Sequence, residues 1–345
     1  MRESLTGERR FLAFLSGAAI VSTLVFILAA VHLIYPWILG GLGLLILAAW
    51  YRFARRPLLR SEPEPNPLST AWRLLFWCPF IVYSALYLLS AMMPEMSPDG
   101  IGYHVGLVTR YYEHRGFFPL TTQMYAGLSG GIEMLFLVAF AFGRHSAAAM
   151  VHLLFLLALP FGILAYARRM GAPRAGVIAA LLVFIAPVVG RDGTCAYVDV
   201  ATGVVVFGAF YSLEIWRADN DRRFLPLAGL LAGFAYAAKF TAAMIVLYGL
   251  IYVVAVCRSR RVRWGSIAAN VTVFATLVCL MAGPWILKDF IQFHNPFFPF
   301  FNSWFPNPYQ YPLAEAQWRE YFTHMNGITL AHIPYQVTVG GRLDG

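Results

Sequence analysis

The chain has 345 residues, of which 59% are hydrophobic and only 12% charged. With a mean hydropathy of +0.64, this balance excludes an ordinary soluble domain and is typical of a polytopic membrane protein. The net charge of +9 would suggest a nucleic-acid partner for a soluble protein, but here the arginines stand in short clusters between apolar runs. That is the membrane-orientation pattern, so we expect an all-α transmembrane protein in the lipid bilayer with no nucleic-acid partner.

The first apolar stretch covers residues 11–51, which contain no Lys, Arg, Asp or Glu. At about 20 residues for each crossing, this length is enough for two helices, with Pro36 at the turn between them. The basic N-terminus before so long an apolar run indicates a retained signal-anchor, because a cleavable signal peptide has an apolar core of roughly 7–15 residues. An arginine-rich and proline-rich linker follows, and then a third apolar run at 74–93.

The third run leads into a polar stretch, from Met96 to Glu113, that contrasts with the apolar sequence around it. Ser97 and Pro98 are typical of an N-cap and a first helical position. Helical spacing then places one set of residues along a single face, with His104 flanking it. That set is Asp99, Tyr103, Gly106, Arg110 and Glu113. A solvated interfacial helix, whose early acid suits the helix dipole, remains an alternative interpretation.

The segment 126–143 decides the sidedness of everything that follows it. We expect it to be a juxtamembrane or re-entrant helix on the same side as Asp99, because 18 of the 26 Lys and Arg residues then face the cytoplasm. A full crossing, the alternative, would move ten of these charges outside. The crossings expected after it are 146–167, 175–190, 198–216, 224–238, 240–257 and 264–287.

The predicted architecture is therefore a multi-span domain at 1–289 with about nine membrane-spanning helices and a cytoplasmic N-terminus. Its large first outer loop, 94–145, carries the juxtamembrane helices. The segment 290–345 is rich in aromatic residues and prolines and is expected on the outer side. Its abrupt end leads us to expect a truncated product.

Two further charged residues fall in apolar surroundings on the expected outer side. Asp199 begins a run without charge as far as Glu214, and such an acid is costly unless it faces a partner or a wet cavity. Residues 224–257 would span about 51 Å as one helix, against roughly 30 Å of hydrocarbon, so they must form a hairpin. Its apex is Lys239, which we expect in a recessed, protein-lined cavity.

The first arm of this hairpin contains Gly229 and Gly233 in a G-x-x-x-G pattern. We interpret this pattern as close helix packing, with no chemistry implied.

Taken in order, these features resemble the C-type glycosyltransferase (GT-C) superfamily, the multi-span enzymes that use lipid-phosphate sugars. The resemblance covers roughly residues 70–300 and is carried by Asp-x-x-x-Tyr-His at 99–104, Asp199, the glycine-rich arm ending in Lys239, Trp285-x-x-Lys288, and Asn295-Pro296-x-x-Pro299. Within the superfamily, the chain is similar to the bacterial branch of the Rgt lipopolysaccharide glycosyltransferases and the aminoarabinose and protein mannosyl transferases.

The resemblance implies a role for two aspartates. Asp99 takes the position of the first-loop catalytic acid, and Asp199 that of the second-loop aspartate. The chain departs from the pattern where Gly100 follows Asp99 in place of a second acid, which weakens a metal-binding interpretation. It departs again in having two crossings before the helix that leads into the first loop. We therefore predict no cofactor, and a divalent metal is not indicated.

The expected reaction moves a sugar from a polyprenyl-phosphate donor to a glycan, lipid or protein acceptor. It needs a base for the acceptor hydroxyl and cations for the phosphate leaving group. Asp99 is the expected base, while Tyr103 and His104 either orient it or bind the sugar. Base-activated single displacement would invert the anomeric carbon. The phosphate-binding candidates are Lys239 and, as alternatives, Arg191, Arg110 and Lys288.

Two other classes of protein remain open. In a transporter or lipid-linked-sugar flippase, the same charged residues would be ligands along a path, but inverted repeats and mid-membrane acids are expected there and are not seen. An O-antigen ligase or polymerase would feature arginines and histidines of the outer loops. The location we expect is a bacterial inner (plasma) membrane, with the active site on its extracytoplasmic face.

Overall fold

The computed structural model describes residues 4–54, 67–121 and 123–307, together with Glu320 and Tyr335. Within these residues the chain folds into helices and contains no strand, which confirms the predicted all-α class. The helices are α1 (Ser4–Ala30), α2 (Pro36–Ala54), α3 (Thr70–Ala91), a π-helix (Gly100–His104), α4 (Val105–Glu113), a 3-10 helix (Met124–Gly127), α5 (Gly131–Arg169), α6 (Pro173–Phe184), α7 (Pro187–Asp192), α8 (Asp199–Asp219), α9 (Phe224–Ala238), a second 3-10 helix (Phe240–Ala242), α10 (Ala243–Ser259) and α11 (Trp264–Phe293).

In the described part of the chain, six helices are long and apolar enough to cross a membrane. They are Gly7–Ala30, Thr70–Ala91, Ser146–Arg169, Asp199–Asp219, Phe240–Ser259 and Trp264–Phe293. Three shorter apolar helices, Pro36–Ala48, Pro173–Phe184 and Phe224–Ala238, complete the set found there. The expected count of nine is the sum of the two groups, and it stays a prediction for the three short members. Of the expected segment 290–345, the residues beyond 307 lie outside the described ones except Glu320 and Tyr335.

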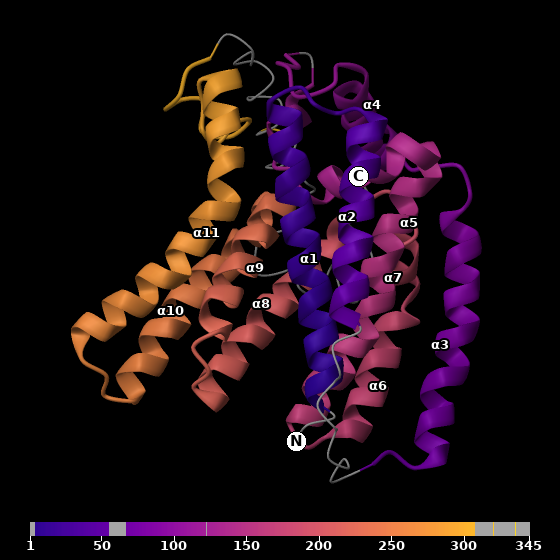
Figure 1. Ribbon diagram of the computed structural model, residues 1–345, viewed down its shortest axis with the longest axis vertical. Coiled ribbons are helices and arrows are strands. Elements are labelled where there is room, and N and C mark those ends of the chain that lie inside the picture. The colour runs from indigo at the N-terminus through magenta and orange to yellow at the C-terminus, as the bar shows by residue number, and fades with distance from the viewer. Residues whose placement is uncertain (1–3, 55–66, 122, 308–319, 321–334, 336–345) are drawn as a thin grey trace.

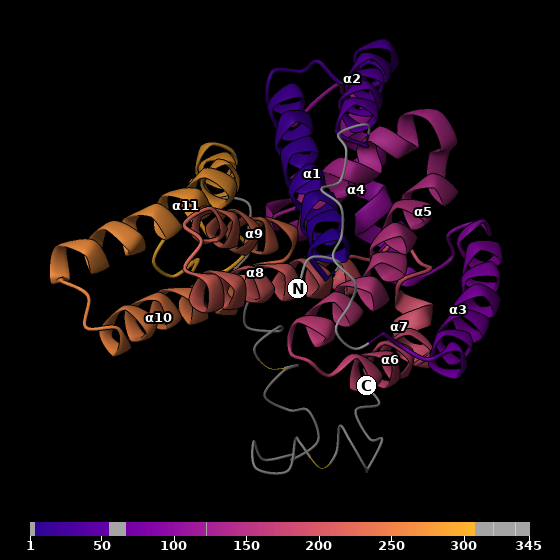
Figure 2. The same cartoon turned by 60° about the horizontal axis from the view of Figure 1, so that its bottom comes forward.

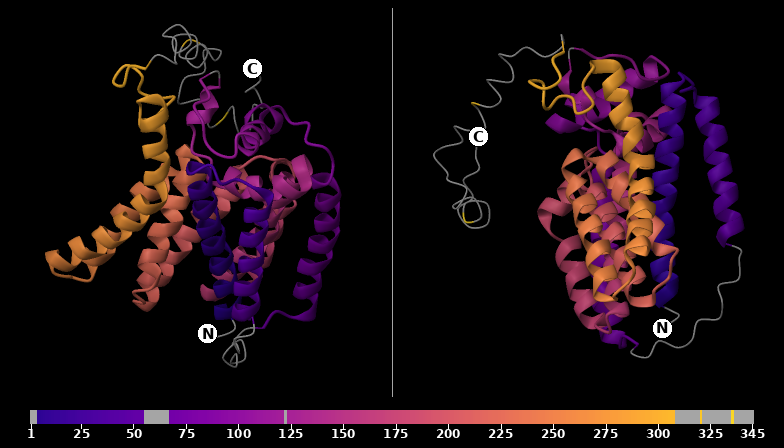
Figure 3. Two further views of the ribbon diagram at one scale, coloured as in Figure 1. Left: turned by 45° about the horizontal axis from the view of Figure 1, so that its top comes forward. Right: turned by 90° about the vertical axis from the view of Figure 1, so that its left-hand side faces the viewer.

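The long helices run side by side and give the bundle two distinct ends (Figure 1). We call them the α4 end, which carries the first outer loop, and the N-terminal end. Figure 3 shows α4 lying across the bundle at the first of these ends. At the edge of the bundle, α3 packs mainly on α5 and α6 and leaves many apolar side chains exposed, as expected for a helix that faces lipid. Figure 2 shows α10 and the first part of α11 leaning away from the rest on the other side.

The first part of α5 starts inside the bundle, and we call it the re-entrant helix. The backbone breaks at Arg144 (φ 59°, ψ −145°), so the segments on its two sides are separate helices. At the start, the Ser22 hydroxyl donates to the Gly131 carbonyl at 2.7 Å, and Ser22 lies about 12 Å along α1 from the end of that helix at Ala30. This segment thus begins inside the bundle and rises to the α4 end, while the juxtamembrane or re-entrant placement expected for 126–143 relative to a membrane stays a prediction.

The central helix of the bundle is α9, which is buried along most of its length. A Cβ atom added to Gly229 would lie 2.5 Å from the Phe274 carbonyl oxygen, and one added to Gly233 would lie 2.6 Å from that of Val278. Both carbonyls belong to α11, so the backbones of the two helices touch at the glycines. The predicted close packing is confirmed, and it fixes where the end of α9 stands against α11.

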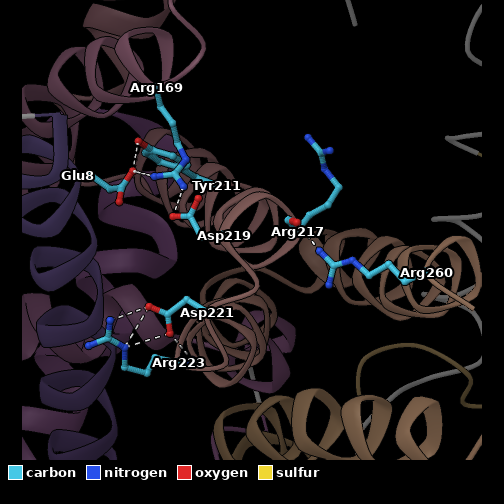
Figure 4. A network of polar contacts seen from close by, with 8 residues as sticks. All are labelled: Glu8, Arg169, Tyr211, Arg217, Asp219, Asp221, Arg223 and Arg260. Carbon is cyan, nitrogen blue, oxygen red and sulfur yellow. Dashed lines mark hydrogen bonds and ion pairs between the residues drawn. The ribbon is translucent and has the colours of Figure 1, made fainter. Parts of the chain in front are cut away.

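The basic clusters meet at the N-terminal end of the bundle (Figure 4). Arg169 contacts Glu8 at 2.9 Å and pairs with Asp219, while Arg260 donates to the side chain of Asn220 at 3.0 Å. These residues come from four segments that are far apart in the sequence. The basic clusters therefore share one end of the bundle, as the positive-inside count assumed. The cytoplasmic location of this end stays a prediction.

Candidate functional site

Some of the polar residues expected in the site, Tyr103, His104 and Lys239, line one pocket at the α4 end. Its empty volume is about 740 Å³, part of which is open to solvent. Three segments form its wall, namely the helix that starts the first outer loop, the beginning of α5, and the junction between α9 and α10. Trp285 of α11 and Phe300 complete it. The site is thus assembled from parts of the chain nearly 200 residues apart.

The helix of the first outer loop begins as the sequence predicted, with Pro98 as its first residue. The Ser97 carbonyl accepts the Ile101 N–H at 3.0 Å, but the Ser97 hydroxyl bonds to the Glu95 carboxylate and does not cap the helix. A π-helix then precedes α4 and adds a wider turn. Asp99 lies exposed at the helix start and Arg110 lies exposed farther along, but the π-helix interrupts the helical spacing between them, so their common face stays a prediction.

The π-helix turns His104 inward, where it meets Glu133 of α5. The distance between His104 Nδ1 and Glu133 Oε1 is 2.7 Å, and both side chains are almost completely buried. Both also line the pocket. Since a buried carboxylate is tolerated only with a close polar partner, this pair ties the first outer loop to the re-entrant helix.

Tyr103 provides an aromatic wall beside this pair. Its ring stacks on that of Tyr125, with 4.2 Å between centroids and 19° between planes. Burial raises the pKa of the Tyr103 phenol, and the carboxylates of Asp99, Glu133 and Asp199 raise it further. The phenol therefore stays protonated and can donate a hydrogen bond. The effect of three carboxylates also places Asp99 and Asp199 near the pocket, although neither is part of its wall.

Lys239 stands in the gap between α9 and α10. Its extended backbone (φ −156°, ψ 127°) interrupts the helical path, and its side chain lines the pocket. The ammonium group pairs with the carboxylate of Asp199, which is the first residue of α8. At 37% exposure for Lys239 and 53% for Asp199, both side chains remain accessible to water. Lys239 thus lines a protein-walled cavity, as expected, and its depth below the membrane surface stays a prediction.

A buried histidine holds the second outer segment in place. His152 Nδ1 donates to the Cys195 carbonyl at 3.0 Å, and Nε2 accepts the Ala201 N–H at 3.1 Å. These two bonds define a neutral ring, because one nitrogen donates and the other accepts. Asp192 accepts the Val200 N–H at 2.9 Å, and its burial raises the pKa of this carboxyl to about 6. The start of α8, and with it Asp199, is therefore fixed.

Three of the predicted cations lie elsewhere. Lys288 is buried, with a side chain that is 4% exposed, and donates to the Ala126 carbonyl at 2.8 Å and to Asp289 at 3.0 Å. This environment suits a structural cation that holds the loop before α5. Arg110 is exposed on α4 and does not line the pocket. Arg191 lines a different groove, which runs between the end of α3 and α7.

This groove also contains an acid that the sequence did not single out. Glu95 accepts hydrogen bonds from the Ser97 N–H at 2.8 Å and from the Ala196 N–H, so it connects the first outer loop to the second. In the sequence Glu95 follows an apolar run and looks like an ordinary loop acid.

Glu133 is the pocket residue to which sequence reasoning assigned no role. The available signal was a lone carboxylate in the apolar run 131–143, where an unpaired acid is expensive. What could not be read from the sequence was its partner, because His104 precedes it by 29 residues and faces it only after the chain has folded back.

The fold and these sites define a multi-pass integral membrane protein with acidic, cationic and aromatic side chains gathered at one end. The family model described as dolichyl-phosphate-mannose-protein mannosyltransferase matches residues 128–286. This match supports the GT-C superfamily and a membrane glycosyltransferase in general. It includes Glu133, Asp199 and Lys239, and it begins after Asp99. Comparisons with curated proteins and with solved structures gave no significant match.

Proposed function

We propose that this protein is a membrane glycosyltransferase that moves a sugar from a polyprenyl-phosphate donor to an acceptor hydroxyl at the α4 end. The observation that carries the proposal is the pocket itself, where Lys239 stands within one wall with buried polar groups and aromatic rings. A cation suits the phosphate of such a donor, and aromatic faces with a few polar groups suit its sugar. The family match over 128–286 supports the same class of donor.

The proposed reaction is a single displacement. The Asp99 carboxylate takes the proton of the acceptor hydroxyl, and the oxygen forms a bond to the anomeric carbon while the bond to the phosphate oxygen breaks. The phosphate leaves with the bonding electrons, and the anomeric configuration is inverted. Asp99 is exposed and makes no side-chain cap bond, so its carboxylate is free to meet an acceptor. The Tyr103 phenol, which stays protonated, is placed to orient substrate hydroxyls.

Lys239 is the proposed counter-ion of the leaving phosphate. In the structure Asp199 holds its ammonium group, so the phosphate would join or replace that carboxylate. Arg191 and Arg110 are further cations at the same end of the bundle. We propose that they attract the phosphate of the lipid donor as it approaches, and that they do not bind it in the pocket. Lys288, which the sequence offered as an alternative, is proposed to act only through the loop that it anchors.

The finer assignments extend this proposal. We place the reaction on the extracytoplasmic face of a bacterial inner membrane, in the branch of the Rgt-like, aminoarabinose and protein mannosyl transferases. The acceptor is a glycan, a lipid or a protein. The alternative function, a transporter or flippase, would bind the same lipid-linked sugar without breaking the glycosidic bond, and so the test below separates the two.

The test measures transfer of label from a panel of radiolabelled polyprenyl-phosphate sugars in membranes that contain the protein. We expect transfer from one donor, and loss of about 10²–10⁴ in rate for Asp99→Asn, as for removal of a general base. The substitution keeps the shape of the side chain and loses only a helix-dipole contribution of about 0.3–1 kcal/mol, so folding should be unchanged. Glu113→Gln, at an exposed acid later on the same helix, is the matched control.

A near wild-type rate in folded Asp99→Asn would remove Asp99 from the mechanism. Translocation of the lipid-linked sugar across proteoliposomes, with its glycosidic bond intact, would instead establish the flippase.

A further inference from the structure

One oxygen of the Glu133 carboxylate has a partner and the other does not. Oε1 lies 2.7 Å from His104 Nδ1, whereas Oε2 is buried and has no hydrogen-bond partner among the described residues. Buried polar atoms are nearly always bonded, and an unbonded carboxylate oxygen is among the most costly exceptions. The carboxylate is therefore held in place by His104 and retains an acceptor in the wall of the pocket.

A glycine lies beside this acceptor. Gly130, which also lines the pocket, has φ −124°, a conformation open to any residue, so its backbone does not demand glycine. A Cβ atom added there would lie 3.3 Å from the Trp285 ring and 3.5 Å from Glu133 Oε2. Even a methyl group would therefore be in tight contact with the indole ring and in van der Waals contact with the carboxylate oxygen, so the glycine keeps this part of the pocket wall free of a side chain.

The pocket wall around this space matches a sugar better than it matches a lipid chain or a phosphate. A carboxylate only accepts hydrogen bonds, and it repels a phosphate while it binds hydroxyl groups. The stacked rings of Tyr103 and Tyr125 offer an apolar face in the same wall. Lys239 is the cation of the wall, so it provides a separate place for a phosphate.

We propose that Glu133 is a sugar-recognition residue: Oε2 accepts a hydrogen bond from one hydroxyl of the donor sugar, while His104 holds the carboxylate through Oε1. The inference rests on the proposed function and adds to it the group that discriminates among donors. Gly130 places no side chain beside Oε2, and the Trp285 ring lies next to the same position.

The test is a binding measurement on the purified full chain, which needs no acceptor. The probes are polyprenyl-phosphate mannose, glucose and galactose, followed by the four deoxy analogues (positions 2, 3, 4 and 6) of whichever sugar binds most tightly. In the wild type, one deoxy analogue should bind about 10- to 100-fold more weakly than the parent, as for loss of a hydrogen bond to a charged group. Glu113→Gln should keep this pattern.

In Glu133→Met, the parent sugar should lose affinity by a similar factor, and the parent and that deoxy analogue should bind equally. Glu133→Gln should retain part of the discrimination, because its amide oxygen still accepts. If Glu133→Met keeps the wild-type ratio between parent and analogue, Oε2 touches no sugar and the inference is overturned. If the wild type binds none of the three donors and no other polyprenyl-phosphate sugar of the transfer panel, the proposed function fails, and the inference fails with it.

Gly130→Ala decides the question if Glu133→Met does not fold. The methyl group would lie 3.5 Å from Oε2 and replaces neither partner of the bond between His104 and Glu133. It should weaken binding of the parent sugar more than binding of the deoxy analogue, because only the parent places a hydroxyl there. Equal weakening of both ligands would contradict the inference.

Discussion

At the scale of single residues, the pocket depends on charges whose positions are set by breaks in helices. Lys239 lies where α9 stops, and Asp199 lies where α8 starts, so each side chain leaves a helix end toward the same point. Their ion pair is partly exposed and contributes little to stability, because water screens it. We therefore expect substitutions here to change binding more than folding.

Replacing Lys239 by Met should weaken binding of a polyprenyl-phosphate donor strongly, because the phosphate loses its cation. Lys239→Arg should retain part of the affinity, since the charge remains while the geometry changes. Arg174→Met removes an exposed cation near the start of α6, at the N-terminal end, and is the control. Donor affinities measured on purified protein test this prediction, and unchanged affinity in Lys239→Met would leave this lysine a structural role only.

Asp192 should make stability depend on pH. Burial raises its pKa from 3.8 to about 6, and the charge of Asp199 adds to this, while the Val200 N–H and Lys239 oppose it. Between these two pH values the folded protein keeps a proton that the unfolded chain has released. The contribution of Asp192 to stability is therefore greatest below pH 3.8 and falls as the pH rises to about 6.

The measurement compares the melting temperatures of the wild type and Asp192→Asn in detergent from pH 4 to pH 7. The difference, variant minus wild type, should become more positive up to about pH 6 and then stay constant. His152 lies 3.7 Å from Asp192 and is unchanged in both proteins. A difference that does not vary with pH would show that the Asp192 carboxyl titrates normally.

At the scale of elements, the packing of α9 on α11 places the pocket. The two glycines let the backbones touch, and Lys239 and Trp285 follow from these helices on the same side of the bundle. The bond from the Ser129 hydroxyl to the Tyr236 carbonyl, at 3.0 Å, then links α9 to the residues just before the re-entrant helix. Any separation of α9 from α11 should therefore also disturb the pocket.

Gly233→Ala should destabilise the protein by about 1–3 kcal/mol, the usual cost of overpacking, because the new methyl group would lie 2.6 Å from the Val278 carbonyl oxygen. Gly203→Ala is the matched control, since a Cβ atom there meets nothing within 4 Å. It should leave stability unchanged or raise it slightly. Thermal unfolding of both variants in detergent tests this prediction. Equal melting temperatures would show that α11 can shift to accommodate the methyl group.

At the scale of the whole molecule, opposite chemistry gathers at the two ends. The N-terminal end holds the arginine clusters and their ion pairs, and the α4 end holds the pocket, the groove and the re-entrant helix. Since basic clusters mark the cytoplasmic side, the α4 end should face outward.

Cysteine labelling in intact cells tests this orientation. In a Cys195→Ser background, Met96→Cys should react with a membrane-impermeant thiol reagent from outside, because position 96 is 79% exposed at the α4 end. Ser259→Cys, at the last residue of α10, should react only after permeabilisation. Labelling of position 259 in intact cells would reverse the assigned orientation. Burial raises the pKa of the native Cys195 thiol, so this residue should react more slowly than a cysteine at position 96.

The sequence by itself determined the class of fold and most helix boundaries. Apolar length and arginine spacing are local properties, and a bilayer allows few structures other than helices to span it. The break at Lys239 and the glycine packing of α9 were likewise predictable, because a 34-residue apolar run is too long for one crossing and G-x-x-x-G has one common use. Tyr103, His104 and Lys239, which were selected by chemistry and by resemblance, line one pocket, and their roles stay a prediction.

Only the tertiary structure decided which charges share the pocket. Lys288 and Lys239 are the same residue type on the same expected side, yet one is enclosed by a carbonyl and a carboxylate and the other lines an open cavity. The role of Glu133 could not be predicted from the sequence, because it depends on contact with His104 and on a π-helix that turns the His104 ring inward. Such pairings depend on contacts between distant segments, whereas the patterns readable in a sequence are set by near neighbours along the chain.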